Sequence, residues 1–192
     1  MTPMGAAALF ALALAAVVIG FVVLGTYNAV VALDRRIDKA WANVDVALKQ
    51  RHDQLPALVD AVRDLMAFER DTLERVTLAR SAYLPEASIP DQAATSEATT
   101  AAVRSLFAVV ERYPDLGSRA NVQDLQDEIE RLEGVIADRR ELYNDQVYRH
   151  NTRISQVPAV LLTGVFGWRD RPFFRAEPAD AAGPDTELAT PA

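Results

Sequence analysis

The hydrophobic pattern of the chain begins with one long apolar segment. No charged residue occurs from Met4 to Leu33, and the run MGAAALFALALAAVVIGFVVLG is long enough to cross the roughly 30 Å hydrocarbon layer of a bilayer as a helix. A cleaved signal peptide is the alternative, but such a peptide begins with a basic region and carries a shorter apolar stretch of about 7 to 15 residues. We therefore predict a short amino-terminal end at residues 1–3 and a transmembrane anchor at residues 4–33.

After this segment, apolar residues recur at spacings of three and four from Ile37 to Tyr83, apart from two gaps in which Arg51 and Glu69 take the expected positions. A second such pattern runs from Val122 to Val157. This heptad-like spacing is typical of helices that pack along a partner helix, and no segment alternates apolar and polar residues as a strand does. The sequence therefore predicts an all-α fold. The helices should be long and coiled-coil-like and form an antiparallel, up-and-down bundle of about four helices over residues 34–156. In this bundle Ile37 is expected level with Val157.

Turn-forming residues interrupt the helical pattern twice. Residues 84–98, LPEASIPDQAATSEA, contain two prolines and many small polar residues, which predicts a loop. Thr95 or Ser96 is then expected to cap a short connecting helix that ends before Pro114 and Gly117.

The decamer RHDQLPALVD, residues 51–60, places a proline inside the first long helix. Pro56 has no N–H to donate to the carbonyl of His52, and its ring crowds that carbonyl. The residue before a proline is also disfavoured in helical geometry. We therefore predict a kink or a helix restart at residues 52–56, with Asp53 as the cap of the resumed helix, and we take Asp53 and Pro56 as candidate hinge residues.

Residues 157–175, VPAVLLTGVFGWRDRPFFR, form a second apolar segment that we call the foot. Its apolar part is too short to span a bilayer, and the arginines and aromatic residues that follow are typical of an interfacial segment on an anionic leaflet. An antiparallel last helix would return the foot to the membrane surface, although packing against the bundle is an equal alternative. The candidate membrane-interface residues are Tyr27, Arg35, Arg36, Trp168, Arg169, Arg171, Phe173 and Phe174.

Charge adds information on the tail and on orientation. The formal net charge is -7, and residues 176–192 hold four acidic residues, three prolines and no basic residue, which predicts a disordered acidic tail. The rest of the chain is nearly balanced and gives no reason to expect nucleic acid as a partner. Arg35, Arg36 and Lys39 follow the apolar segment, whereas no Lys or Arg precedes it, so we expect the amino terminus outside and the helical domain in the cytoplasm.

Catalytic and metal-binding residue types are sparse. The chain has no Cys, which excludes disulfides, a thiolate nucleophile and the usual zinc clusters. His52 and His150 are the two histidines, and the expected register places them too far apart to share a metal ion. His52 and Asp53 are adjacent on a helix, so they point about 100° apart and cannot orient each other. No nucleotide-binding or hydrolase motif is present, and we expect no enzyme activity, metal or cofactor.

Several longer runs resemble the LemA family. They are YNAVVALDRRIDKAWANVDVALKQRHDQLPALVDAV, ERYPDL, LQDEIERLEGVIADRRELYNDQVYRHN and the closing FF, within residues 27–174. The resemblance implies a bacterial membrane protein with one amino-terminal span, an outside amino end and a four-helix bundle, but no established molecular function. The chain departs from the family at His150-Asn151, where Tyr-Asn is usual, and at Gly134, where a polar residue is common.

These features favour a membrane-anchored, non-enzymatic scaffold or protein-interaction module of the bacterial cell envelope, single-pass in the plasma membrane. Its expected partners are membrane lipids together with other proteins or further copies of itself. Two alternatives stay open. One is a lipid-binding or membrane-remodelling module that acts through residues 157–175. The other is an adaptor or regulatory subunit of a membrane enzyme such as a protease.

Overall fold

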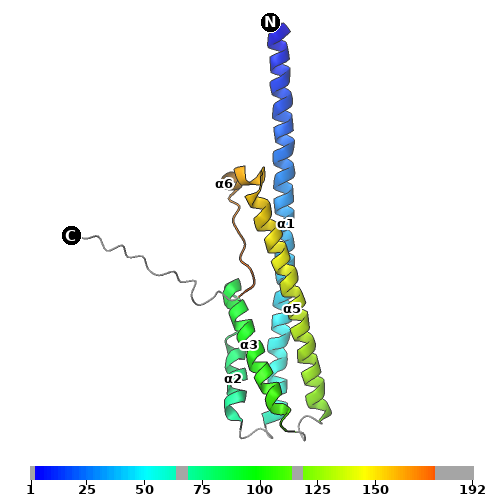
Figure 1. The fold of residues 1–192 in the computed structure, drawn as a ribbon, viewed down its shortest axis with the longest axis vertical. Coiled ribbons are helices and arrows are strands. Elements are labelled where there is room, and N and C mark those ends of the chain that lie inside the picture. Colours follow the sequence, from blue (N-terminus) through cyan, green and yellow to red (C-terminus); the bar gives the residue numbers. More distant parts are fainter. Residues whose placement is uncertain (1–2, 64–68, 114–118, 176–192) are drawn as a thin grey trace, which may run out of the picture. The chain divides into compact units, whose positions relative to one another are not determined.

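A computed structural model describes residues 3–63, 69–113 and 119–175, and these ranges are helical without any strand (Figure 1). The elements in chain order are α1 (Pro3–Arg63), α2 (Arg70–Ser81), α3 (Ile89–Val110), α5 (Ala120–Ser155), the 3-10 turn η1 (Ala159–Leu161) and α6 (Thr163–Phe166). The predicted all-α class with one long apolar amino-terminal helix is confirmed.

The chain divides into two compact units, and the two longest helices contribute to both. Unit 1 comprises residues 1–50 and 131–173, and unit 2 comprises residues 51–130 and 174–192. The first part of α1 and the last part of α5 therefore belong to unit 1, while the remaining parts of both helices belong to unit 2. The domain boundaries expected from the sequence stay a prediction.

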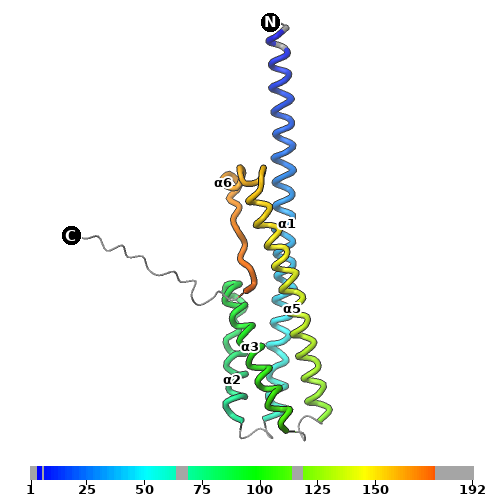
Figure 2. Tube along the Cα trace, viewed as in Figure 1, coloured from blue at the N-terminus to red at the C-terminus, as the bar shows by residue number. Residues whose placement is uncertain are grey.

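Unit 2 is a four-helix arrangement around one apolar core. The carboxyl-terminal part of α1, the helices α2 and α3, and the start of α5 each contribute buried side chains to it. Figure 2 shows the course of these helices. The spacing of three and four along each helix places these side chains on one face, which explains why the bundle forms. The buried core residues are Leu55, Leu58, Val59, Val62, Val76, Val103, Leu106, Val109, Val110, Val122 and Ile129.

Unit 1 is an antiparallel pair of α1 and α5, with the foot following the end of α5 (Figure 2). Val30 packs with Ile154, and the rings of Trp41 and Tyr143 meet edge to face with centroids 5.5 Å apart. The expected pairing of Ile37 with Val157 is therefore wrong by about ten residues, or roughly 15 Å of helix. Heptad spacing fixes which face of each helix is buried, but a shift from one core position to another, such as three, seven or ten residues, preserves that face.

Most of the apolar positions expected along the seam are buried, including Ile37 and Val44 on α1 and Leu132, Ile136 and Val147 on α5. The last one, Val157, is exposed. It lies beyond the end of α5 at Ser155, so the helical period no longer directs its side chain.

The predicted helix restart at residues 52–56 is wrong, whereas the alternative of a kink there stays a prediction. The structure describes α1 as continuous through Pro56, so Asp53 lies inside the helix as an exposed residue and not at a cap. The carbonyl of His52, which Pro56 leaves without its helical donor, accepts a hydrogen bond from Nε of Arg80 at 3.3 Å. A donor from α2 thus satisfies the position that proline disrupts.

The first long helical pattern is divided elsewhere, because α1 ends at Arg63 and α2 begins at Arg70. The next helix also begins earlier than expected. Ser88, not Thr95 or Ser96, caps α3, and its hydroxyl accepts a hydrogen bond from the Asp91 amide at 3.3 Å. A proline in the first turn and the acidic Asp91 suit this start. The predicted loop at residues 84–98 is therefore wrong from Ile89 onward, because prolines and small polar residues also occur in the first turns of a helix.

Three sequence predictions lie outside the described residues. They concern residues 1–2 of the short amino end, the break at Pro114 and Gly117, and the acidic tail at residues 176–192.

Candidate membrane-proximal site

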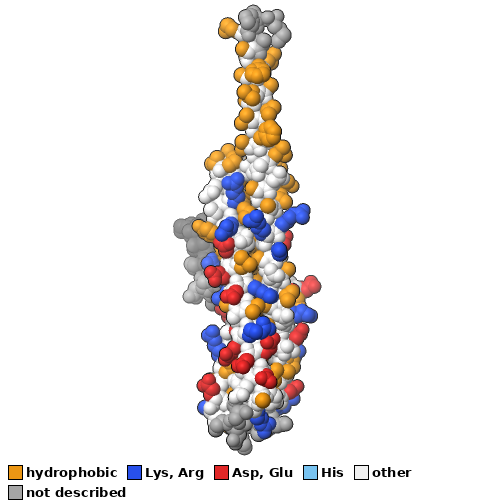
Figure 3. Space-filling view, turned by 90° about the vertical axis from the view of Figure 1, so that its right-hand side faces the viewer, with side chains coloured by type: hydrophobic (Ala, Val, Ile, Leu, Met, Phe, Trp, Pro, Cys, Tyr) orange, Lys and Arg blue, Asp and Glu red, His pale blue; other side chains and the backbone are white. Residues whose placement is uncertain are grey.

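The amino-terminal part of α1 exposes large apolar side chains from Met4 to Leu24 on all sides of the helix. Among the described residues, α1 is the helix that is long and apolar enough to cross a membrane, and its most apolar window is not buried. Thr26 fits this setting because its hydroxyl donates to the carbonyl of Val22 at 2.7 Å, which leaves no unpaired donor. Figure 3 shows hydrophobic side chains covering this part, with Lys and Arg side chains following it.

Three aromatic rings lie where the apolar segment of α1 ends. Tyr27 of α1 packs against Phe166 and Trp168 of the foot, with ring centroids 5.1 Å and 6.3 Å away, and Phe166 stacks on Trp168 at 5.1 Å. Aromatic side chains of this kind suit the boundary between hydrocarbon and headgroups. Arg35 and Arg36 follow two turns later on α1, both exposed.

The foot reverses direction at Gly167 and brings Trp168 back onto the helix pair. Gly167 ends α6 with φ of +68°, a left-handed conformation that side chains other than glycine rarely adopt, and the Trp168 amide donates to the carbonyl of Thr163. Trp168 then packs on the small core of Val30, Ile154 and Ala159. The outer side of the foot stays apolar and exposed, with Leu161 at 74% and Val165 at 77% of their full accessible areas.

An ion-pair and amide network fixes the segment after this reversal. Arg171 contacts Asp34 at 3.2 Å and Asp38 at 2.6 Å, two α1 residues that share one helix face. The amide of Arg171 donates to Oδ1 of Asn151 at 2.9 Å, and Nδ2 of Asn151 donates to the Arg171 carbonyl at 3.0 Å. The side chain and the backbone of Arg171 are therefore both held by unit 1.

Tyr143 forms a hydrogen bond with Pro172, the residue after Arg171. Its hydroxyl donates to the carbonyl of Pro172 at 2.8 Å, and its side chain is fully buried. Burial raises the pKa of Tyr143 to about 12, the Arg171 charge opposes that rise and the Asp38 charge adds to it. The phenol is therefore kept neutral and able to donate over the ordinary range of pH.

A small pocket opens between α1, α5 and the foot, and we call it the foot pocket. Its volume is about 280 Å³. Charged groups of both signs, one indole ring and the buried imidazole of His150 line it. Nδ1 of His150 lies 3.2 Å from Oδ1 of Asn151. The lining residues are Val30, Val31, Asp34, His150, Gly167, Trp168, Arg169, Asp170 and Arg171.

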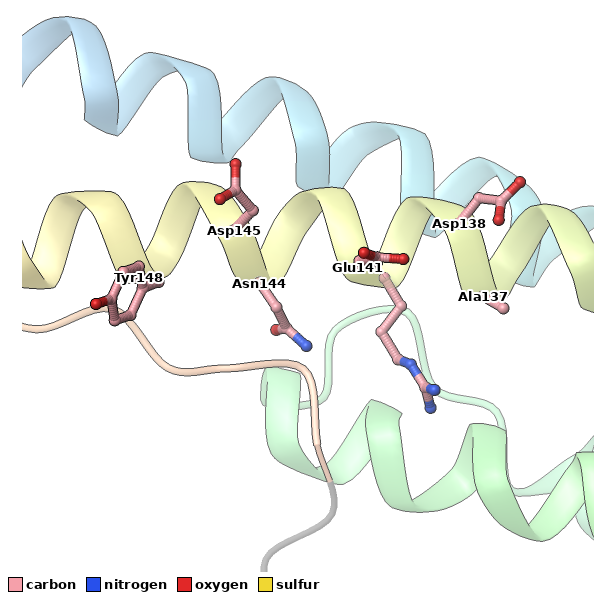
Figure 4. Close-up of a pocket in the computed structure, with 7 residues that line it drawn as sticks. Ala137, Asp138, Glu141, Asn144, Asp145 and Tyr148 are labelled. Atoms are coloured by element: carbon pink, nitrogen blue, oxygen red, sulfur yellow. The ribbon is translucent and has the colours of Figure 1, made fainter.

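A wider hollow lies on the outer side of α5, and its volume is about 590 Å³. Figure 4 shows Asp138 and Asp145 along one edge of the helix, and Asn144 and Tyr148 along the other. Tyr148 is 62% exposed although it carries a large ring. The lining residues are Ala137, Asp138, Arg140, Glu141, Asn144, Asp145 and Tyr148.

The structure separates the eight sequence-predicted interface residues into three groups. Tyr27 and Trp168 belong to the aromatic cluster. Arg35, Arg36 and Arg169 are exposed, and Phe173 is half-buried.

Two of the eight are not placed as an interface requires. Phe174 is buried within the protein, and Arg171 is held by two carboxylates, so neither is a free membrane contact. Sequence reasoning missed Asp34, Asp38 and Asn151. The spacing of four between the two aspartates was the available signal for a docked cation.

Among the residues that the structure describes, no group of three or more His, Asp or Glu side chains is arranged to hold a metal ion. His52 stacks on Tyr83 in unit 2 with ring centroids 5.1 Å apart, while His150 lines the foot pocket of unit 1.

Comparison with known proteins gives a family match over most of the chain. The sequence model described as "LemA family" matches residues 40–187. Magnetosome protein MamQ 2 and Magnetosome protein MamQ 1 of Paramagnetospirillum magneticum (strain ATCC 700264 / AMB-1) are each 32% identical over 90 residues. That similarity covers 47% of this chain and 32% of each relative, so the chain spans about a third of the length of the curated relatives it matches.

Proposed function

Because this chain belongs to the LemA family and carries an amino-terminal helix able to cross a membrane, we propose that it is a membrane-anchored, non-enzymatic interaction module of the bacterial cell envelope. It binds protein partners or further copies of itself through the outer face of α5. The anchor confines the module to the membrane plane, and the long helices present polar surfaces away from the bilayer.

The observation that carries this proposal is the exposed ring of Tyr148 at the edge of the α5 hollow (Figure 4). Tyrosines in partly enclosed, polar-rimmed sites are frequent anchors of protein interfaces, because a tyrosine buries a large area and also offers a hydroxyl. Arg140 and the acidic residues around the hollow supply the polar rim.

Photo-crosslinking in intact membranes tests the proposal. A photoreactive phenylalanine analogue at Tyr148 should give a discrete crosslinked product, either with another protein or with a second copy of the chain. The matched control is Leu78 on α2, which is similarly exposed but lies outside the hollow. Equal yields at the two positions, or no product at Tyr148, would contradict the proposal.

A second candidate function is lipid contact through the foot, and the exposed apolar outer side of the foot favours it. Leu161 and Val165 are almost fully exposed beside the end of the apolar segment of α1. Each large aliphatic side chain that enters the bilayer contributes about 1.5–3 kcal/mol, so two such residues stabilise a shallow insertion.

Brominated lipids measure that insertion in the full chain. The protein has two tryptophans, so Trp41→Phe leaves Trp168 as the reporter. Lipids brominated near the headgroup should quench Trp168, and the additional changes Leu161→Ser and Val165→Ser should relieve the quenching. Unchanged quenching in that variant would show that the outer side of the foot does not insert.

The orientation is a separate part of the proposal. Arg35 and Arg36 directly after the apolar segment support a cytoplasmic helical domain and an outside amino terminus. The chain has no cysteine, so Ala108→Cys on α3 provides a single exposed label position. An impermeant maleimide should label it only after the membrane is opened, and labelling of intact cells would reverse the orientation.

A further inference from the structure

The foot pocket combines charged side chains of both signs with an indole ring and an imidazole. Two acidic residues, Asp34 and Asp170, and two basic residues, Arg169 and Arg171, line it, so its formal charge is balanced. Asp34 and Arg171 form an ion pair with each other at 3.2 Å. Arg169 and Asp170 are exposed, and neither forms an ion pair with another residue that the structure describes.

We propose that the foot pocket binds the headgroup of a zwitterionic phospholipid with a primary ammonium, as in phosphatidylethanolamine. The proposal deepens the lipid contact described above and rests on the membrane anchoring of α1. It assigns a ligand class and two binding residues, Arg169 and Asp170, to a cavity that the anchor alone does not require.

The headgroup chemistry matches the two unpaired charges. The guanidinium of Arg169 offers several N–H donors in a planar fork, which suits the phosphate diester. The carboxylate of Asp170 accepts N–H bonds from the ammonium. Phosphate and ammonium are two carbons apart in phosphatidylethanolamine, so adjacent residues of opposite charge fit their separation. The docked Arg171 fixes the backbone directly after this pair.

The position of the pocket matches the depth of a headgroup. Val30 and Val31 line it from the last turn of α1 before Asp34, the first charged residue after the apolar segment. Trp168 lines it from the foot and contacts Tyr27. A headgroup in the pocket therefore leaves its acyl chains beside the exposed apolar surface of α1, at the level where interfacial aromatic residues lie.

The size of the foot pocket argues against an acyl chain as its ligand, and the charge of its lining argues against an anionic headgroup. About 280 Å³ lies just below the range of roughly 300–1,000 Å³ typical of pockets for drug-sized ligands, so the pocket accommodates a headgroup but not an acyl chain. An anionic headgroup would call for a net positive lining, as in basic lipid sites, whereas this lining is balanced. Phosphatidylcholine has the same net charge but no ammonium N–H to donate to Asp170.

Native mass spectrometry of the full chain, released from detergent with defined dioleoyl lipids, tests the proposal. We expect the wild-type protein to retain phosphatidylethanolamine at least about threefold more than phosphatidylcholine or phosphatidylglycerol. The double variant Arg169→Gln, Asp170→Asn should remove that preference. The single variants are measured alongside it and should each weaken the preference, which keeps the test decisive if the double variant loses helical circular dichroism.

The matched control is Asp60→Asn with Arg63→Gln, which removes the same two charges from an exposed pair of unit 2, outside the lining of the foot pocket. This control should keep the wild-type preference. Absence of a phosphatidylethanolamine preference in the wild type, an equal or greater preference for phosphatidylglycerol, or variants that all behave like the wild type would each overturn the headgroup site.

Alkaline carbonate extraction of membranes separates this failure from failure of the membrane anchor. Protein that resists extraction but shows no lipid preference retains its anchor and lacks the headgroup site. Protein that is released by carbonate contradicts the anchoring on which both proposals depend.

Discussion

Replacing Tyr143 by Phe should remove a pH-dependent part of the stability of the α1 and α5 pair. The phenol is fully buried, and its hydroxyl donates to the carbonyl of Pro172 at 2.8 Å. Burial raises the pKa of Tyr143 to about 12, while a tyrosine in the unfolded chain titrates near 10. The folded protein therefore holds the phenolic proton more tightly than the unfolded chain does.

The sign and size of the effect follow from this difference. Because the folded pKa is raised, the stabilisation is fully present below about pH 10 and is lost as the pH rises through about 12. A shift of about two units corresponds to roughly 2–3 kcal/mol of unfolding free energy. The Phe variant lacks this loss, but it also lacks the hydrogen bond to Pro172, which contributes about 1 kcal/mol at neutral pH.

Urea unfolding of the full chain in detergent micelles measures both quantities. Trp168→Phe leaves Trp41 as the fluorescent reporter, and its ring packs on Tyr143 with centroids 5.5 Å apart. Wild type should be more stable than the Phe variant by about 1 kcal/mol at pH 8, and the variant should be the more stable of the two near pH 12. The difference between the two proteins cancels the titration of the other tyrosines and of the lysines.

Parallel stability curves for the two proteins between pH 9 and pH 12 would refute this reasoning. They would mean that the phenol of Tyr143 titrates equally in the folded and unfolded chain, and that the residue is therefore not buried against Pro172. Tyrosinate absorbance gives an independent reading, since one of the five tyrosines should titrate later in the wild type than in the unfolded chain.

Four further changes probe the contacts that hold the foot and the first helix. Arg171→Gln should lower the unfolding free energy by about 1 kcal/mol, because its ion pairs are partly exposed, and the loss should shrink in high salt, as urea titrations at two salt concentrations would show. Asn151→Ala should cost about 1–3 kcal/mol and speed hydrogen exchange of the Arg171 amide, and unchanged exchange would count against the amide clamp. Pro56→Ala should preserve the helical circular dichroism and stabilise the protein by about 1 kcal/mol by restoring the bond to the His52 carbonyl. Arg80→Gln should then cost less in the Pro56→Ala background than in the wild type, and a double-mutant cycle without coupling would contradict the role of Arg80.

The sequence determined the class of the fold and the buried face of each long helix. The uncharged and largely apolar character of residues 4–33 is itself the requirement for a helix in hydrocarbon, so no tertiary contact is needed to infer the anchor. The spacing of three and four along α1 and α5 is likewise local, and the residues at these positions are mostly the buried ones. Both features follow from the order of side chains along a regular helical backbone.

Only the tertiary structure decided the level at which α1 and α5 pair. Packing of Trp41 on Tyr143 sets that level, since the heptad pattern permits several registers of equal burial. The same limit applies to the predicted helix restart, whereas the hinge role of Asp53 and Pro56 stays a prediction. Whether Pro56 breaks a helix depends on whether another element supplies the missing donor, and Arg80 from α2 does so.

The arrangement of the membrane-proximal site also depends on tertiary contacts. Sequence composition marked Trp168, Arg169 and Arg171 as interfacial, but it did not distinguish an arginine held by Asp34 and Asp38 from one that is free. Asp34 and Asp38 lie on α1, far from Arg171 in the chain, and only the return of the foot at Gly167 brings these three residues together. Local patterns specify which residues are charged, whereas the fold determines which charges neutralise each other and which stay available to a ligand.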